Sequence, residues 1–499
     1  MRKSISNNAV FAYGIFLFIC LALSESLNAV SQTSLNLENG FKPYGSYDHT
    51  SIDTVNLLNG GLTVHIALPY TWPQRGGKLT VGHSFVWNSK YWQVDETSVG
   101  NLYWSLTIPK TLYSPFTHPH RLIVNRSVIS YTGYSPAVFS SIEDLITEDG
   151  ASHQLIAVNS DNSIITSPET VPVTFVTEDT SGYRVDLTGT PDEYGVYPTV
   201  KITDRSGNIY HGVFGISGSV GTSGCTHTLT NGISYGDIAP FQDLDEVTWD
   251  CHESSGATIV EDSNGNTVNF GLLDSLGRDV WGSSTTNDGC DQTSYTSSSN
   301  TPETITICYI TTSLQSSFNV SGISEHTSGS LGLDSISQVS SITLADGRSW
   351  TFSYDSYGNI TNIHTPQGAY VLYEWATVPF PACNSITPVS RSISKRTIFD
   401  GTNIYIWNYQ WGEVASDGTI TNTVTDPTGN SQTHTFTPMD VNGDACGHME
   451  TSTAYYQGNT SGSLLRKVDT VYSSGGRNLV PVSITTTQGN DLARAKRIP

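Results

Sequence analysis

A short bend, Asp-x-x-Gly followed by Asn or Arg, recurs from residue 204 onward and constrains the fold more than any other feature of this chain. Its Asp accepts hydrogen bonds from backbone N–H groups two residues on, and its Gly supplies the positive φ that closes a hairpin. The five copies have their Asp and Gly at Asp204 and Gly207, Asp262 and Gly265, Asp274 and Gly277, Asp355 and Gly358, and Asp426 and Gly429. A single copy is an ordinary turn, but five copies with strand-like flanks predict a series of antiparallel strand reversals.

Composition favours the same conclusion. The chain has 45 Gly and 25 Tyr but only 3 Met, and charged residues make up 14% of it. Strands draw on β-branched and aromatic residues and turns on Gly, Asn and Asp, whereas the residues that build long helices are sparse here. We therefore predict an all-β protein, with an N-terminal β-sandwich-like region followed by antiparallel β-meanders.

The predicted organisation has three parts. Residues 1–30 form a signal peptide, residues 31–194 an N-terminal β domain, and residues 195–499 a region of degenerate repeats. The copies of the bend are unevenly spaced, because Ser/Thr/Gly-rich inserts at 282–303 and 312–333 interrupt them. We expect these inserts to be loops.

The N-terminal domain contains its own strand signals. Leu62, Val64 and Ile66 alternate with polar residues, and residues 79–87 alternate in the same way. This period of two predicts half-buried strands. Residues 143–146, by contrast, suggest a short helical turn.

The first residues carry an export signal. Arg2 and Lys3 precede an apolar run from Ala9 to Leu23, and a polar, small-residue stretch follows, with cleavage expected near Ala29. The alternative is a single N-terminal anchor, but the run is short against the ~20 residues that a bilayer span needs. No later stretch is long and apolar enough to span, so we expect a secreted or cell-surface protein without a membrane span.

The net charge excludes one class of partner, and the cysteine content bears on the redox compartment. The net charge is −22, so the basic surface of a nucleic-acid-binding protein is absent. The six cysteines beyond the signal permit three disulfides in an oxidising compartment, and buried free thiols are the alternative. They are Cys225, Cys251, Cys290, Cys308, Cys383 and Cys446, and the sequence leaves their connectivity open. No Cys-x-x-Cys pair marks a zinc site.

Residues 346–375 give the clearest local pattern. Trp350, Phe352 and Tyr354 alternate with small polar residues up to the bend at Asp355, and a second turn follows at Pro366. The pattern predicts a meander of three strands with one aromatic face. Because a lone meander is only marginally stable, other strands must cover that face.

This stretch resembles the YD repeat of the bacterial RHS family. The residues that carry the resemblance are Tyr354, Asp355, Gly358, Pro366, Gly368 and Tyr373. Residues 41–92 are similar to the region preceding the repeats in secreted RHS proteins, and residues 455–468 are similar to inter-repeat sequence. The resemblance implies a β-strip that winds into a hollow shell around a cargo, with toxin cargo or further repeats supplied by downstream sequence.

The chain also departs from the family. RHS proteins of this kind are much longer, and this sequence lacks their C-terminal core signature and variable toxin tip. It therefore resembles the N-terminal part of such a protein, and we expect a truncated one.

Motifs of known chemistry have simpler interpretations. Residues 232–236 match Gly-x-Ser-x-Gly, but neither a buried strand before them nor a helix start after them is indicated. Asp440, Asn442 and Asp444 resemble the start of a calcium loop, yet Ala445 stands where Gly is needed. No phosphate-binding loop, HExxH or dinucleotide fingerprint is present. We predict no catalytic, cofactor-binding or metal-binding residues, and hence not an enzyme.

Three functions remain open. The first is a secreted, non-enzymatic protein with a structural or interaction role, whose partners are proteins or glycans. The second is the N-terminal part of a toxin-delivery RHS shell. The third is a secreted carbohydrate-binding or carbohydrate-active protein that stacks sugars on exposed indoles, although in β-rich proteins such indoles belong more often to the core. The indoles considered include Trp87, Trp92, Trp104, Trp407 and Trp411.

Overall fold

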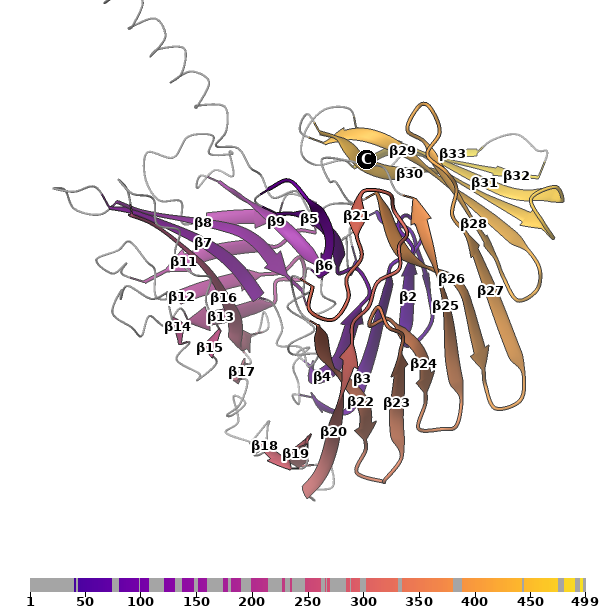
Figure 1. Cartoon of the computed structure of the whole chain (residues 1–499). Coiled ribbons are helices and arrows are strands. Elements are labelled where there is room, and N and C mark those ends of the chain that lie inside the picture. Colours follow the sequence, from indigo (N-terminus) through magenta and orange to yellow (C-terminus); the bar gives the residue numbers. More distant parts are fainter. Residues whose placement is uncertain are drawn as a thin grey trace, which may run out of the picture. The chain divides into compact units, whose positions relative to one another are not determined.

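The structure is a computed structural model, and every regular element that it describes is a β-strand (Figure 1). The described residues are 40–41, 44–73, 80–97, 99–106, 121–130, 137–147, 151–158, 174–177, 181–189, 199–213, 227–228, 234–235, 247–261, 265, 267–269, 284–287, 289–296, 302–330, 334–379, 388–441, 444–473, 480–489 and 494–496. Contacts divide the chain into two units, Met1–Ser34 and Leu35–Pro499, and the predicted signal peptide lies outside the described residues. The all-β prediction is confirmed. Among the described residues, none belongs to a helix that is long and apolar enough to cross a membrane.

One antiparallel sheet of fifteen strands dominates the second half of the chain. Its strands follow one another in sequence order, so each pairs with the strand before it and the strand after it. They are β18 (Ser284–Asn287), β19 (Cys290–Thr296), β20 (Pro302–Ser313), β22 (Ser335–Thr343), β23 (Ser349–Tyr354), β24 (Ile360–His364), β25 (Tyr370–Pro379), β26 (Val389–Phe399), β27 (Ile404–Gln410), β28 (Ile420–Thr425), β29 (Ser431–Val441), β30 (Asp444–Gln457), β31 (Ser463–Tyr472), β32 (Pro481–Gln488) and β33 (Arg494–Lys496). The expectation of a loop at 282–303 is wrong, because β18 and β19 lie there and cross-strand pairing overrides the polar composition.

Tight turns with a left-handed Gly join several of these strands. At the turn between β23 and β24, the Asp355 carboxylate accepts hydrogen bonds from the backbone N–H groups of Tyr357 and Asn359, at 3.0 and 2.8 Å. Gly358 has φ 83° and donates its N–H to the Asp355 carbonyl. The same backbone pattern closes the turn at 426–430 in this sheet and the turn at 204–208 in another sheet of the molecule. These turns make the sheet a meander in which most connections are short; the longer segment between β20 and β22 contains β21, which pairs with β6.

The first strands of the chain form two smaller sheets. β1 (Tyr47–His49), β2 (Asp53–Asn56), β3 (Leu62–Pro73) and β4 (Thr80–Asn88) pair in that order. β5 (Trp92–Glu96) pairs with β6 (Leu102–Leu106), and β21 (Ile323–Ser324) adds to β6 in parallel. The strands predicted around Leu62 and at residues 79–87 are therefore present as β3 and β4.

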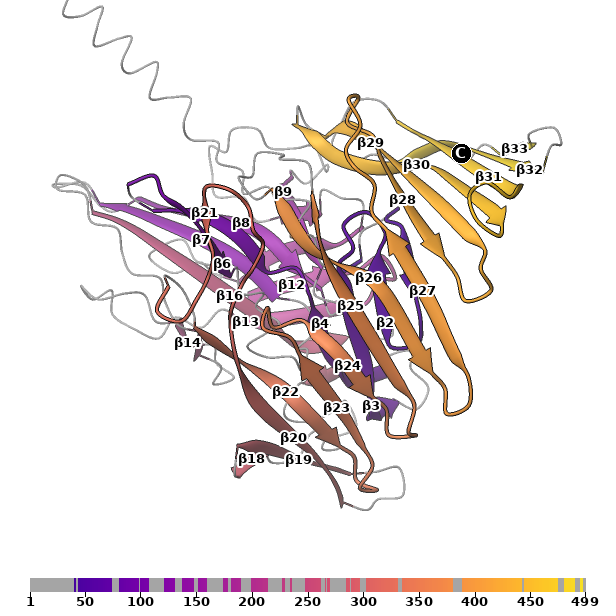
Figure 2. The same cartoon turned by 45° about the vertical axis from the view of Figure 1, so that its right-hand side comes forward.

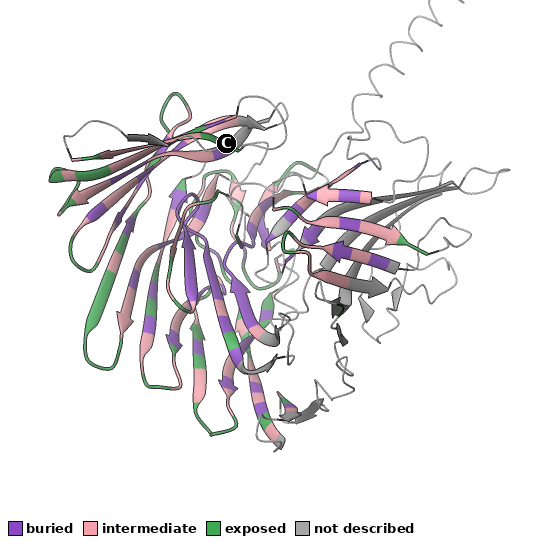
Figure 3. Cartoon of the chain, turned by 180° about the vertical axis from the view of Figure 1, so that it is seen from behind, coloured by how far each residue is buried: buried purple, intermediate pink, exposed green. Residues whose placement is uncertain are grey.

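The long sheet and these first strands share one hydrophobic core. Phe85 of β4 packs on Phe352 of β23 with ring centroids 4.8 Å apart, and Trp87 lies edge-on to Trp375 of β25 at 6.5 Å. Figures 1 and 2 show the indigo strands β2–β4 alongside the orange strands of the long sheet. Figure 3 shows buried positions alternating with more exposed ones along the long sheet. The first strands thus cover the aromatic face that the repeat leaves open.

A further sheet, of nine strands, has a separate, smaller core. Its order is β13-β12-β11-β10-β9-β8-β7-β16-β17, and a further pairing of β16 with β13 closes eight of the strands into a ring. The strands are β7 (Arg121–Ser130), β8 (Ala137–Ile146), β9 (Ser152–Ala157), β10 (Thr174–Thr177), β11 (Arg184–Thr188), β12 (Thr199–Thr203), β13 (Ile209–Val213), β16 (Val247–Glu261) and β17 (Thr267–Asn269); β14 (His227–Thr228) and β15 (Ser234–Tyr235) pair only with each other. The helical turn expected at 143–146 is wrong, because these residues extend β8 and pair with β7 and β9. The predicted domain division at residue 194 stays a prediction.

Candidate functional site

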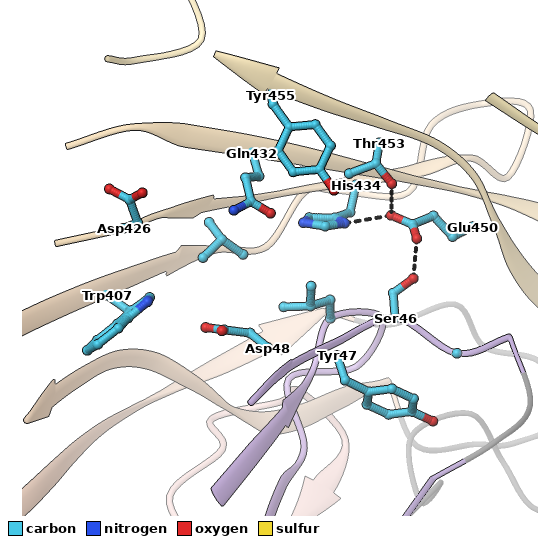
Figure 4. A pocket seen from close by; sticks show the side chains of 13 residues that line it. Ser46, Tyr47, Asp48, Trp407, Asp426, Gln432, His434, Glu450, Thr453 and Tyr455 are labelled. Atoms are coloured by element: carbon cyan, nitrogen blue, oxygen red, sulfur yellow. Dashed lines mark hydrogen bonds and ion pairs between the residues drawn. The ribbon is translucent and has the colours of Figure 1, made fainter. Parts of the chain in front are cut away.

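A polar cavity of about 280 Å³ lies between β1 and the strands β27–β30 (Figure 4). One wall comes from residues 45–48 and the other from strands some 360 to 410 residues later, so the packing of these two segments on each other creates the cavity. Its lining comprises Gly45, Ser46, Tyr47, Asp48, Leu57, Trp407, Val424, Asp426, Gln432, His434, Glu450, Thr453 and Tyr455.

Glu450 on β30 is the centre of the hydrogen bonds in this cavity. Its carboxylate accepts hydrogen bonds from the Ser46 hydroxyl, from the Thr453 hydroxyl at 2.8 Å and from Nδ1–H of His434 at 2.5 Å. Burial disfavours the charged carboxylate, but the hydrogen bonds and the neighbouring imidazole outweigh it and keep the pKa of Glu450 below its usual value. Glu450 is therefore ionised at neutral pH and joins β29, β30 and the segment before β1.

Of the two ring nitrogens of His434, one is hydrogen-bonded and the other is not. The residue is only 5% exposed, and its Nδ1 faces Glu450. Nε2 is buried without a hydrogen-bond partner, and Figure 4 shows the ring within the cavity. Because the ionised Glu450 can only accept, Nδ1 of His434 donates the proton in this hydrogen bond. A buried polar atom without a hydrogen-bond partner is costly, so Nε2 is an uncompensated polar atom beside this cavity.

The opposite wall is held by a buried ionic cluster around Arg396 of β26. Its guanidinium donates to Asp53 at 3.0 Å and to Asp48 at 2.9 Å, and Arg396 and Asp53 are both buried. The hydroxyls of Tyr373 and Tyr409 donate to the same two carboxylates, each at 2.6 Å. Burial opposes the charge of Arg396, but the neighbouring carboxylates raise its pKa further above the usual range. This cluster fixes β1 and β2 against the inner face of the long sheet.

A second buried cation, Lys90, follows β4. Its Nζ donates to the Ser390 hydroxyl at 2.6 Å and to the Arg391 carbonyl at 2.7 Å, and lies 3.3 Å from the Ser392 hydroxyl. Burial, and then the charge of Arg391, lower the pKa of Lys90 well below its ordinary value. A basic amine among serine hydroxyls is an arrangement that can activate a nucleophile. The three side chains are, however, buried, and none of them lines the described cavity.

Most of the repeat-turn residues predicted from the sequence have structural contacts away from the cavity. Tyr354 donates its hydroxyl to the Val339 carbonyl at 2.6 Å, while Tyr373 belongs to the Arg396 cluster. Gly265 has φ 78°, and Gly368 has φ 88° in the turn that includes Pro366. Asp426 is the one predicted residue that lines the cavity. Asp262, Asp274 and Gly277 lie outside the described residues.

Of the six cysteines considered, two form a described disulfide. Cys290 and Cys308 are cross-strand partners in β19 and β20 and are covalently bonded. The expectation that disulfides form is therefore supported for this pair. Cys225 and Cys383 lie outside the described residues, and nothing is described of the side chains of Cys251 and Cys446, which lie within β16 and β30.

The weak chemical motifs can be placed only in part. Ser234 of the Gly-x-Ser-x-Gly match lies in β15. Val441 pairs with Asp444, so the chain reverses at the calcium-loop-like segment as the turn interpretation expects. Within the described ranges, no three His, Cys, Asp or Glu side chains are grouped so that they could hold a metal ion.

Sequence reasoning missed the cavity's main residues. Ser46, His434 and Glu450 belong to no motif, nor does Arg396, which holds the lining residue Asp48, and only tertiary packing brings their segments together. The only signal was the two-residue spacing of His434 and Phe436, which places both on one face if residues 431–436 form a strand.

The fold and these contacts define a class: an all-β protein whose long meander is built from short strands and Gly-closed turns. Within that class, the family model described as RHS Repeat matches residues 334–370, which span β22–β24 and the turns around them. This stretch therefore matches an RHS repeat, and the resemblance predicted from Tyr354 to Tyr373 is supported there. A search of curated proteins gave no match.

Two solved structures are similar to the chain. One is titled TcdB2-TccC3-TEV, with 10% identity over 90% of this chain and 27% of that chain, at a TM-score of 0.13. The other is TcdB2-TccC3 without its hypervariable C-terminal region, with 12% identity over 89% of this chain and 25% of that chain, at a TM-score of 0.15. The chain spans about a quarter of the length of these structures. TM-scores this low carry no argument about how the strands are arranged.

Proposed function

We propose that this chain is a secreted, non-catalytic β scaffold that acts by contacting other proteins. The observation that carries the proposal is the difference between the two faces of the long sheet. The inner face is filled by the chain's own first strands through one continuous core. The outer face of β25–β27 exposes apolar side chains that no described strand covers.

The outer side chains form a compact group by register. Tyr370 pairs with Phe399, which pairs with Ile404, and Leu372 and Ile406 both pair with Thr397. Tyr370 and Phe399 stack at 5.0 Å, while Ile404 is 58% exposed. Grouped apolar surface of this kind marks contact sites more often than isolated exposed residues do.

The interaction role can be tested by photo-crosslinking in the native host. A benzophenone amino acid replaces Ile406, and the matched control replaces Thr421, an exposed position on the neighbouring β28. We expect a discrete protein adduct at 406 and none at 421. Equal labelling at both positions, or no adduct at either, contradicts the proposed contact surface.

Export can be tested on the same cells. The mature protein is expected in the extracellular or surface fraction, beginning near residue 30, with Cys290 and Cys308 joined in a non-reduced peptide digest. An uncleaved protein with free thiols in the cytoplasm contradicts the secreted role.

The two other functions have different support. A role in an RHS shell around a cargo rests on the repeat at 334–370. For sugar binding, Trp87, Trp92 and Trp104 are each at most 5% exposed, which favours the core interpretation of these indoles. We therefore place the scaffold role first and the shell second.

A further inference from the structure

We propose that the disulfide between Cys290 and Cys308 is a thiol–disulfide exchange site at the edge of the long sheet, and that its reduction releases the hairpin β18–β19 from β20. The inference goes beyond the scaffold role, since it concerns one edge of the sheet and not the outer face of β25–β27.

The first argument is the side of the sheet on which the disulfide lies. Ile305 and Ile307 of β20 are buried in the common core, so the alternation of a strand places Thr304 and Cys308 on the opposite, outer face. Thr304 is exposed there, and Cys290 and Cys308 are both half-buried. A disulfide is reduced only where a thiolate can reach one of its sulfurs. The outer face gives such access.

The second argument is the unequal anchoring of the two strands that the disulfide joins. β20 contributes two isoleucines to the core, and Tyr309 packs against it. The side chains described for β19, at 290–294, are one cysteine and four polar residues, of which Thr293 is the buried one. Backbone pairing, the disulfide and hydrogen bonds such as that from the Tyr309 hydroxyl to Asp291 at 3.0 Å hold β19 in place. β19 can therefore separate while the core stays closed.

The third argument is the local reach of the bond. Cys290 and Cys308 are direct cross-strand partners only 18 positions apart. A disulfide that closes so short a loop restricts the unfolded chain less than one that joins distant segments. The register between β20 and β22 also shifts next to Cys308, and such bulges are common at sheet edges and beside functional positions. The bond thus controls the edge of the sheet and adds little to the fold as a whole.

The reductant is a dithiol. One of its thiolates attacks a sulfur of the disulfide, so the S–S bond breaks while a mixed disulfide forms, and its second thiolate then breaks the mixed disulfide. Cys290 and Cys308 together gain two electrons and two protons and become thiols, and the dithiol loses the same numbers and becomes a disulfide. Release of β19 leaves the backbone N–H and C=O groups of β20 as an open strand edge.

The first test measures access in the folded mature chain. Dithiothreitol reduces the protein, iodoacetamide blocks the new thiols, and peptide mapping reports the labelling of Cys290 and Cys308. We expect the labelling rate in the folded protein to lie within tenfold of the rate in urea. A rate more than tenfold lower, or labelling only after unfolding, marks a purely structural disulfide and overturns the proposal.

The second test is hydrogen exchange with and without dithiothreitol. We expect amides of β18 and β19 to exchange at least tenfold faster in the reduced protein, while those of β23–β25 stay within twofold. Unchanged exchange in β19 shows that the hairpin stays bound without the disulfide. Equal acceleration in β23–β25 shows that the bond supports the whole core. Either result overturns the proposal.

The matched control is the double variant C290S/C308S. Its β19 amides should exchange as fast as those of the reduced wild type, with or without dithiothreitol. Oxidised glutathione should restore slow exchange in the wild type but not in the variant. If the variant does not fold, reoxidation of the wild type carries the test, and failure to restore slow exchange overturns the proposal. These outcomes are independent of crosslinking at Ile406, so the exchange site and the scaffold role can fail separately.

Discussion

Lys90 and Arg396 are both buried cations, yet their surroundings differ in kind. Arg396 faces two carboxylates and two tyrosine hydroxyls, so its charge is compensated where it lies. Lys90 has neutral oxygen partners and the cation Arg391 nearby, so burial drives it toward the neutral amine. Burial alone therefore does not tell how much either side chain contributes to stability.

The change Arg396→Met is expected to destabilise the protein by about 3–5 kcal/mol, because it leaves buried Asp53 without its counter-charge. Urea unfolding measures the loss. The double variant with Asp53→Asn should recover part of it, since the uncompensated charge is then gone. A loss under about 1 kcal/mol in the single variant would contradict the structural role of the cluster.

The change Lys90→Met is expected to alter stability by less than about 1.5 kcal/mol at pH 7, because an apolar side chain of similar length avoids the cost of burying an amine. The pKa of Lys90 is lowered on folding, so between the folded value and 10.5 the unfolded state binds more protons. Wild-type stability should therefore rise with pH over that window relative to the variant. Parallel stability curves from pH 7 to 10 would show that the amine is not perturbed.

Glu450→Gln tests the carboxylate of the cavity. We expect a loss of about 1–3 kcal/mol at pH 7, since three hydrogen bonds lose a charged acceptor. The folded pKa of Glu450 lies below 4.5, so its contribution is complete above pH 4.5 and disappears as the pH falls through the folded value. The wild type and variant should converge there. Glu374→Gln is the matched control: its carboxylate is 63% exposed and pairs with Lys395, so the change should have little effect at either pH.

At the scale of elements, two turn glycines differ in what requires them. The backbone conformation requires glycine at both positions, and packing requires it at only one. Gly358 and Gly429 have the same φ of 83°. A Cβ on Gly429 meets nothing within 4 Å, whereas a Cβ on Gly358 lies 2.9 Å from Ile336 and from the Tyr91 hydroxyl.

Gly429→Ala should therefore cost about 1–2 kcal/mol, the price of a left-handed L-residue. Gly358→Ala should cost a further ~1–3 kcal/mol, because the added methyl group also overpacks the core. Thermal or urea unfolding of both variants gives the difference. Equal losses would show that the core beneath Gly358 yields without strain.

The sequence predicts these turns well because their cause is local. Asp355 and Gly358 fix their turn through contacts within five residues. Turns without a leading Asp were missed at Gly347 and Gly418, although both have positive φ. An Asp-Gly dipeptide, itself a hairpin signal, marks each of them.

The cavity was not predictable in the same way. Its hydrogen bond from Ser46 to Glu450 joins residues separated by 404 positions. No local sequence pattern brings these two residues together, because their contact depends on how β1 packs against the long sheet. The strands could thus be predicted from alternation and the reversals from Asp and Gly, while the site needed the tertiary structure.

At the scale of the whole molecule, the N-terminal strands and the long meander form a single packing unit. The sequence indicated that the aromatic face of the meander needs a cover, but not which strands supply it. Phe85, Trp87 and Trp92 supply it from β4 and β5. The core of the closed ring, around Leu145 and Phe175, is separate from this one.

This shared core predicts coupled opening of segments that are distant in sequence. Phe85→Ala removes about 3–5 kcal/mol of packing from a side chain that is 1% exposed and contacts Phe352. Hydrogen exchange of amides in β3 and β4 and in β23–β25 should accelerate by the same factor, because one cooperative opening exposes them all. Leu145→Ala, the matched change in the ring core, should leave both segments protected. If Phe85→Ala accelerates only β3 and β4, the two layers open independently, and the first strands are a detachable cover on a sheet that is stable by itself.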